Sequence, residues 1–317
     1  MPLGHGYPLW DPVGELESQR LKQGLMIGDV GLITAKGQFR YYFNIFLPVS
    51  DPNQLQCPPD LEPLSPPLDA SEIVTNPTYF PPGTALASKG VEVTRTSESP
   101  LDLSFNVKAR DCGIIVLPNG ASREDLVSTS RFHQYVNKHA LSWYQFINEM
   151  LSGNPHPNGC LYLLTGTDKT SEWGLACSPE YASWAGDDMS IRYETAKGRP
   201  WHDVDKIASR ASRSTDGIPM CAVFVRGMRI ALNPRAWSKH ILKNRPPREF
   251  PLYNLLNTPT VGIRARIQTR IERWKHFPKH YQSVNTEVRL LRFCLVLKMK
   301  LFPDPFSSTG RYCRAPP

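Results

Sequence analysis

Residues 101–108 alternate apolar and polar side chains with a strict period of two. The apolar set is Leu101, Leu103, Phe105 and Val107, and the polar set is Asp102, Ser104, Asn106 and Lys108. This alternation predicts a strand with one buried face and one face in water, which is typical of an antiparallel sheet. A parallel sheet covered on both faces would instead need continuous apolar runs.

Other stretches predict further strands. Residues 25–47 are typical of a hairpin, with "LMIGDVGLIT" and "FRYYFNIFL" flanking "AKGQ", and Gly28 and Gly31 indicate a bulge or tight bend. One face of the second run is expected to carry Phe39, Tyr41, Phe43, Ile45 and Leu47. That face is expected to form a wall of the core; the alternative is a stacking platform for a ligand. "GVEVTRT", "CGIIVLP" and "MCAVFVRGMRIALN" predict more strands, the last with Arg226-Gly227 as a candidate turn.

Apolar residues spaced by four and three predict one long amphipathic helix over about 122–151. Its stripe is Phe132, Val136, His139, Trp143, Phe146 and Met150. Ser122 with Asp125 three positions later is similar to a capping box, and Gly153 and Pro155 are expected to end the helix. His139 is expected to be a core or boundary residue and not a ligand, because no residues with metal-ligand spacing accompany it.

Proline limits where helices and central strands can form. The chain has 30 Pro in 317 residues, and ten of them lie within residues 48–82. Because Pro lacks a backbone N–H, this segment is expected to be a long loop over the body or an ordered linker, and not a central strand. The order of strands, helix and strands predicts an α+β fold with a mainly antiparallel sheet, in a single body over residues 1–237.

The positive charge is concentrated at the C-terminal end. Of the 37 Lys and Arg and 29 Asp and Glu, residues 240–317 hold 15 and 4, which leaves 22 and 25 for residues 1–239. The near-neutral body predicts no specific nucleic-acid partner. The basic segment over residues 238–317 is expected to be a mobile tail, or the mis-spliced or frameshifted end of a gene model.

Within that tail, residues 261–277 are typical of a basic amphipathic helix. Its charged residues are Arg264, Arg266, Arg270, Arg273 and Lys275. They are candidates for contact with an anionic membrane surface or an acidic partner. The alternative is a solvated helix with an ordinary packing face.

The remaining features concern the class of protein. The seven Cys are irregularly spaced without a C-x-x-C pair, the first residues do not form a secretory signal, and no apolar run approaches a spanning length of about 20 residues. We therefore expect a cytoplasmic protein with reduced thiols. No motif for a cofactor or a metal ion is present, so none is expected.

The stretch "LYLLTGTDKTSEWGLACSP", residues 161–179, holds an Asp-Lys-Thr like that of the phosphorylated-aspartate ATPases. Ser171 and Glu172 stand where that family has Gly and Thr, and no Gly-Asp-Gly-x-x-Asn-Asp follows. The sequence instead predicts a hairpin with a polar tip. Its binding candidates are Thr167, Asp168, Lys169 and Thr170.

Other catalytic signatures are missing. Ser122 lies in "GASRE" and not in G-x-S-x-G, and "HFPKH" at residues 276–280 has an internal Pro and lacks the Glu of a zinc protease. The leading hypothesis is a non-enzymatic binding or interaction module with a protein partner. The alternatives are a membrane-acting, pore-forming defence protein, motivated by strand 101–108 and helix 261–277, and a hydrolase in which Asp168, His139 or Asp29 converge.

Several phrases together resemble a family of uncharacterised proteins expanded in mushroom-forming basidiomycete fungi. They are "MPLGHGYPLWDP", "IGDVGLIT", "LPNGASREDL", "LYLLTGTDKTSEWGLA" and "VFVRGMRIAL", which span about residues 1–235. The resemblance implies a fungal, intracellular, multi-copy protein. No catalytic residue carries over, because the family has no assigned activity, and the tail after about residue 238 does not match.

Overall fold

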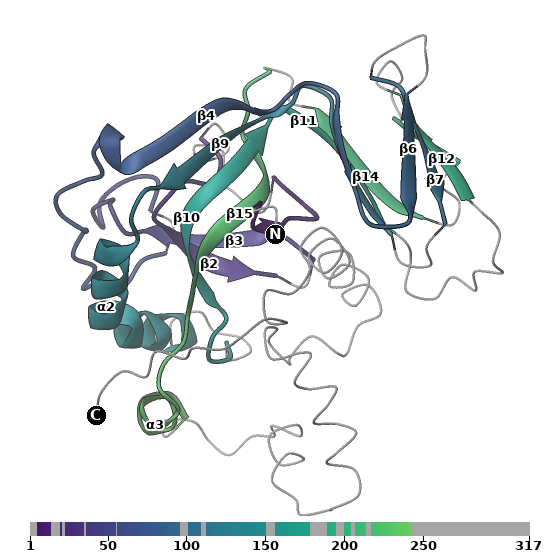
Figure 1. Cartoon of the computed structure of the whole chain (residues 1–317). Helices are drawn as coiled ribbons and strands as arrows, with labels where there is room; N and C mark the ends of the chain where they lie inside the picture. Colours follow the sequence, from purple (N-terminus) through teal and green to yellow (C-terminus); the bar gives the residue numbers. More distant parts are fainter. Residues whose placement is uncertain are drawn as a thin grey trace, which may run out of the picture.

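The described part of the chain folds into three antiparallel sheets with the amphipathic helix α2 packed on one of them (Figure 1). The structure is a computed structural model that describes residues 5–13, 20, 23–34, 36–54, 56–95, 101–108, 112–149, 156–177, 189–194, 200–203, 207–213 and 217–242. Of the predicted basic tail, residues 243–317, with the five candidate contacts from Arg264 to Lys275, lie outside the described residues. In the described part of the chain, no helix has the length and apolar character needed to cross a bilayer.

The largest sheet holds seven strands, and all of its pairings are antiparallel. Its main path runs β1 (Tyr7–Pro8), β15 (Cys221–Ile230), β10 (Leu161–Thr170), β2 (Asp29–Ile33) and β3 (Phe39–Asn44). On a side branch, β9 (Ala121–Leu126) pairs with β10, and β4 (Ile73–Phe80) pairs with β9. β15 is one strand, so the candidate turn at Arg226-Gly227 was wrong. Gly227 is needed there because a Cβ would lie only 2.5 Å from Leu163 O on β10.

Two four-stranded sheets form a sandwich beside the large sheet (Figure 1). The first runs β14 (Ala208–Arg213), β11 (Glu172–Cys177), β8 (Gly113–Leu117) and β5 (Thr84–Ala87). The second runs β13 (Trp201–His202), β12 (Met189–Tyr193), β7 (Leu103–Val107) and β6 (Val91–Arg95).

Alternation along the strands builds the core of this sandwich. Leu103, Phe105 and Val107 pack against Ile114 and Val116 of the facing sheet. The predicted amphipathic strand 101–108 is therefore confirmed, and its apolar face is buried inside the protein. The next residues along β8, Ile115 and Leu117, point the other way and pack with Trp10, Phe80 and Phe224 at the end of the large sheet.

Two long segments, β8 followed by β9 and β10 followed by β11, join the large sheet to the sandwich. β8 and β9 run antiparallel to β11 and β10, from Gly113 opposite Cys177 to Asp125 opposite Gly166. Ser171 alone separates β10 from β11, and Pro118–Gly120 separates β8 from β9. The same four strands therefore contribute to both cores.

Helix α2 (Ser130–Glu149) covers one face of the large sheet. Its buried residues are Phe132, Tyr135, His139, Ala140, Trp143, Tyr144 and Ile147. The start expected at Ser122 was wrong, because residues 121–126 are strand β9 between β4 and β10. Arg123 and Asp125 point to one face of β9 and Ser122 and Glu124 to the other, but all four residues are polar. The apolar–polar alternation by which a sequence indicates a strand is therefore missing here. Pairing on both sides of β9 outweighs its local helical signal.

The predicted hairpin at 25–47 is confirmed as β2 and β3, but its single aromatic face is wrong. The register shifts so that Val30 faces Phe43 while Gly31 faces Tyr41, which leaves Tyr42 as an extra residue on β3. Such a bulge turns later side chains to the other face. Phe39 and Tyr41 therefore lie in one core cluster and Phe43 and Ile45 in another.

The Pro-rich segment 48–82 wraps over helix α2 and then becomes an edge strand. Leu64 and Leu68 pack against the helix core, and Tyr135 Oη donates a hydrogen bond to Glu62 O. The short helix η1 (Ala70–Glu72) and strand β4 follow. β4 contains Pro77, and among the described strands it pairs with β9 alone, as expected for a Pro-containing strand.

The described chain ends with α3 (Pro234–Trp237) and η2 (Ser238–Leu242). Asn233 caps α3 through a hydrogen bond of 2.8 Å from Arg235 N to Asn233 Oδ1. Trp237 and Ile241 then pack on the core beneath helix α2.

Candidate functional site

The stretch that holds Asp168 is not a hairpin tip. β10 continues through Thr170 while paired with both β9 and β15, and β11 then proceeds into the neighbouring sheet. Thr167, Asp168 and Thr170 are at most 1 % exposed, whereas a tip would be in water. The prediction of a polar tip was wrong because pairing partners from distant parts of the chain enclose these polar side chains.

Asp168 is held by two arginines from the strands on either side of β10. Arg123 Nε and Nη2 donate to Asp168 Oδ1 and Oδ2 at 2.8 and 2.7 Å, and Arg226 Nη1 donates to Oδ1 at 2.8 Å. The bidentate pair with Arg123 is among the strongest hydrogen-bonding arrangements in proteins. Both carboxylate oxygens are therefore occupied by cationic donors.

Arg226 crosses β10 to reach β9 as well. Its Nε donates to Asp125 Oδ1, and its Nη2 donates to Glu124 O at 3.0 Å. Gly166 lies on β10 between these groups, and a Cβ at this position would overlap the Asp125 carboxylate. Gly166 therefore leaves the room through which Arg226 meets β9.

His5 closes this group of residues from outside. Arg123 Nη2 lies 3.0 Å from His5 Nδ1, and Arg226 Nη1 donates to His5 O at 3.0 Å. Since Arg123 can only donate, His5 Nδ1 accepts and the ring is neutral. Burial, together with the neighbouring Arg123, lowers the pKa of His5 to about 4. We call Asp168, Arg123, Arg226, Asp125 and His5 the Asp168 cluster.

The Asp168 cluster does not support nucleophilic catalysis. An attacking carboxylate oxygen needs a free lone pair directed at substrate, with a metal ion or cations that stabilise the transition state. Here the two arginines bind the carboxylate itself, and the Tyr79 ring covers Arg123 with its centroid 3.5 Å from Arg123 Cζ. Among the described residues, no group of three or more His, Cys, Asp or Glu is arranged to hold a metal ion.

Lys169 and Thr167 point to the opposite face of β10, as alternation requires. Lys169 Nζ donates to Gln23 O at 3.3 Å and lies 3.8 Å from Glu124 Oε2. Burial lowers the pKa of Lys169, while Glu124 and Asp29 oppose this effect. Thr167 Oγ1 is buried and has no hydrogen-bond partner among the described residues.

Thr170 has a structural role at the junction of β10 and β11. Its Oγ1 lies 2.6 Å from Gly120 O and 2.9 Å from Glu172 O, and it accepts from Glu172 N at 3.3 Å. These contacts join the segment β8–β9 to the segment β10–β11, at the point where each segment passes from one sheet into the other. Thr170 is therefore separated in role from Lys169, although the sequence placed both in one candidate site.

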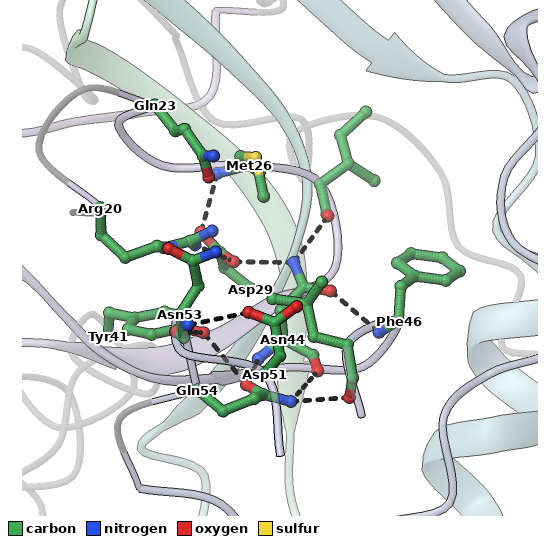
Figure 2. A network of polar contacts seen from close by, with 12 residues as sticks. Arg20, Gln23, Met26, Asp29, Tyr41, Asn44, Phe46, Asp51, Asn53 and Gln54 are labelled. Atoms are coloured by element: carbon green, nitrogen blue, oxygen red, sulfur yellow. Dashed lines mark hydrogen bonds and ion pairs between the residues drawn. The ribbon is translucent and has the colours of Figure 1, made fainter. Parts of the chain in front are cut away.

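A second buried charge centre is built around Asp29 (Figure 2), and Asp29 and Arg20 both act electrostatically on Lys169. Arg20 Nη2 donates to Asp29 Oδ1 at 2.6 Å, and Asn44 Nδ2 donates to the same oxygen at 2.8 Å. Met26 N donates to Asp29 Oδ2 at 2.7 Å. Burial raises the pKa of Asp29, and Arg20 and these hydrogen bonds oppose the rise.

The surroundings of this pair are built by the β2–β3 hairpin and the loop after it. Gln54 Oε1 accepts from Asn44 N at 2.8 Å, and Tyr41 Oη donates to Asn53 O at 2.9 Å (Figure 2). Arg20 Cζ stacks over the Tyr41 ring at 4.4 Å from its centroid. We call Arg20, Asp29, Asn44 and Tyr41 the Asp29 cluster.

The residues of the hydrolase alternative do not gather. Asp168 contacts Arg123 and Arg226, whereas Asp29 contacts Arg20 and Asn44. His139 lies on helix α2, where it stacks on Trp143 at 6.4 Å and packs against Tyr135. It is buried on the core-facing side of the helix, in agreement with the prediction of a core or boundary residue.

Sequence reasoning found Asp168, Lys169 and Asp29 but missed the arginines that complete the two clusters. Arg123 was assigned to a helix and Arg226 to a turn, and Arg20 lies in a segment with no pattern. One signal could have identified Arg123. Arg123 and Asp125 are spaced as on one face of a strand, and an Arg on such a face can pair with an Asp on a neighbouring strand. Arg20 offered no comparable signal.

No family model, curated protein or solved structure matches this chain.

Proposed function

We propose that this chain is a non-enzymatic interaction module that binds a protein partner through the ribbon of β4 and β9. The proposal is carried by the exposure of β4. Its residues 74–78 are all exposed, so both faces of the strand are open to water. An ordinary edge strand covers its core with at least one face.

The ribbon also carries apolar side chains on its surface. Val74 is 58 % exposed and Val127, just after β9, is 60 % exposed. Val127 N donates to Glu72 O at 2.8 Å, so both valines lie near the same end of the ribbon. We call them the Val74–Val127 patch. Exposed apolar groups beside polar strand residues suit the centre of a protein interface.

The two buried clusters support this proposal indirectly. The Asp168 cluster ties β9 to β10 and β15 with ion pairs, and Arg123 also stacks on Tyr79 of β4. The ribbon therefore projects from a rigid base. A rigid base lowers the conformational entropy lost on binding.

The membrane-acting alternative has less support. Its strand motif, residues 101–108, has its apolar face inside the sandwich, where Phe105 and Val107 are fully buried. The basic helix that also motivated it lies outside the described residues. Membership of the basidiomycete family that the sequence resembles stays a prediction.

The test is co-purification from the native cells with three tagged versions of the full chain. They are the wild type, the double variant Val74→Lys/Val127→Lys, and a control, Val49→Lys/Ile218→Lys. The control valine and isoleucine are 47 % and 44 % exposed but lie elsewhere on the surface. We expect a partner that the wild type and the control recover and the patch variant does not.

The recovered partner, produced alone, should bind the wild type directly and the patch variant at least about tenfold more weakly in calorimetry. A partner set that is unchanged by the patch variant would show that this surface is not the interface. Turnover of an ester, peptide or phosphate substrate that a folded Asp168→Asn or His139→Gln variant loses would show that the protein is an enzyme.

A further inference from the structure

The guanidinium of Arg20 is buried without its full set of partners. Its side chain is 1 % exposed, and Nη2 donates to Asp29 Oδ1. Nε and Nη1, which together carry three N–H groups, have no hydrogen-bond partner among the described residues. Buried cationic donors are costly to leave unpaired, so their persistence indicates a missing partner.

Lys169 is a second cation near Arg20, and its side chain is 12 % exposed. Its ammonium group carries three N–H donors, and its one printed hydrogen bond, to Gln23 O, is long at 3.3 Å. Glu124 Oε2, at 3.8 Å, is beyond hydrogen-bond distance. Gln23 N in turn donates to Arg20 O at 3.0 Å, so one short turn connects the two cationic residues.

The buried carboxylate near Arg20 and Lys169 already accepts hydrogen bonds from several donors. Asp29 accepts from Arg20, Met26 N and Asn44, and it is the fully buried carboxylate of this face. Arg20 pairs with this carboxylate, whereas the ion-pair partner of Lys169 is Glu124, whose side chain is 40 % exposed. The mutual repulsion of Arg20 and Lys169 contributes to the lowered pKa of Lys169, after the larger effect of burial.

A neutral donor accompanies the two cations. Thr167 is two residues before Lys169 on β10 and points to the same face. Its Oγ1 is buried and also has no partner among the described residues. A hydroxyl on the same strand face as an ammonium, with a guanidinium connected to that ammonium through one turn, is a set of donors that can bind an oxyanion.

We propose that Arg20, Lys169 and Thr167 bind the oxyanion group, a phosphate or a carboxylate, of a small ligand on the face of β10 opposite Asp168. Arg20 supplies its free N–H groups, Lys169 supplies charge, and the Thr167 hydroxyl donates the third contact. The two cations attract an anion more strongly than they attract a neutral water molecule. Tyr41, stacked on Arg20, holds the guanidinium plane in position. This site is independent of the Val74–Val127 patch.

The experiment uses the full chain, exchanged into a chloride buffer of fixed ionic strength. Inorganic phosphate and acetate are titrated separately, by calorimetry and by thermal unfolding. We expect saturable binding of one of them and a rise in Tm of about 3 °C at ten times its Kd. Binding of phosphate alone assigns a phosphorylated ligand, and binding of acetate alone assigns a carboxylate.

Two variants that keep the Asp29–Arg20 pair provide the decisive comparison. Lys169→Met and Thr167→Val replace donors by side chains of similar size, and circular dichroism checks that each is folded. Each should weaken anion binding at least about tenfold. Lys108→Met, at an exposed Lys paired with Glu92, is the control and should bind as the wild type does. Absence of saturable binding to either anion, or equal binding by the folded Lys169→Met and Thr167→Val variants, would overturn the proposal.

Discussion

Asp168 and Arg123 lie directly opposite each other on neighbouring antiparallel strands, and the Arg123 guanidinium binds both oxygens of the Asp168 carboxylate. Arg226, on the strand at the other side, donates to the same carboxylate. The residue that most resembled a nucleophile therefore joins three strands of the large sheet. We therefore expect substitutions of Asp168 to lower the stability of the folded protein.

Asp168→Asn should lower the free energy of unfolding by about 3–5 kcal/mol, because two largely buried guanidinium groups lose their shared counter-charge. Urea denaturation measures this value. The matched control is Asp125→Asn, whose side chain is 33 % exposed and contacts the same Arg226, and it should cost about 1 kcal/mol or less. Equal losses in both variants would contradict the central position of Asp168.

Gly166→Ala should lower the free energy of unfolding by about 1–3 kcal/mol through overpacking. A Cβ there would overlap the Asp125 carboxylate and would lie 2.7 Å from Glu124 O. Thr94→Ala on exposed β6 introduces the same residue into a strand and should change stability by less than about 0.5 kcal/mol. A Gly166→Ala protein as stable as the wild type would show that Arg226 and β9 do not approach this closely.

His5 should make stability depend on pH between about 4 and 6.5. Its pKa is lowered from 6.5 to about 4 in the folded protein, so the unfolded chain binds more protons in this window. Stability should therefore be complete above pH 6.5 and should fall as the pH drops toward 4. The loss is on the order of 2 kcal/mol, since one pKa unit corresponds to about 1.4 kcal/mol and partial contact with solvent reduces the full value.

The comparison for His5 is His5→Asn, which keeps an acceptor near Arg123 but does not titrate. Chemical denaturation at several pH values measures the difference between wild type and variant. This difference should shrink as the pH falls, because only the wild type loses stability through His5. A difference that stays constant from pH 7 to pH 4 would contradict the lowered pKa.

Tyr144→Phe should cost about 1–3 kcal/mol, because the buried hydroxyl serves groups on two segments. Tyr144 Oη donates to Ile230 O at 2.7 Å and accepts from Gly159 N at 2.8 Å. The amide of Gly159 should also exchange hydrogen faster in the variant. Tyr162→Phe, on β10, is the control and should stay within about 0.5 kcal/mol. Unchanged exchange at Gly159 would mean that the hydroxyl does not hold this loop.

Local pattern was sufficient where a strand or helix buries one face by itself. The alternation of Leu103, Phe105 and Val107 predicted β7, and the spacing of Phe132, His139 and Trp143 predicted the face of helix α2. The glycines around Asp29 predicted the bend at Gly28, which has a φ of 90°. Each of these signals depends only on residues close in sequence, because the spacing of side chains along a single strand or helix is enough to reveal it.

The Asp168 cluster could not be predicted in this way. Arg123 is 45 residues from Asp168 and Arg226 is 58 residues away, and both lie in segments whose polar composition favoured another structure. The bulge at Tyr42 likewise moved Phe43 and Ile45 to a different core from Phe39. Register is a property of two paired strands, so a single strand's sequence does not specify it.

The sequence by itself therefore determined that the described part of the chain is built mainly from antiparallel strands with an amphipathic helix packed on them, because periodicity along the chain is local. The tertiary structure alone decided that Thr167 and Asp168 are buried, and that Asp168 and the partly buried Lys169 face opposite sides of β10. Burial of a charge depends on whether partners from distant strands arrive to neutralise it. Here Arg123 and Arg226 pair with Asp168 on one face of β10, while Thr167 Oγ1 on the other face, and Arg20 Nε and Nη1, have no hydrogen-bond partner among the described residues.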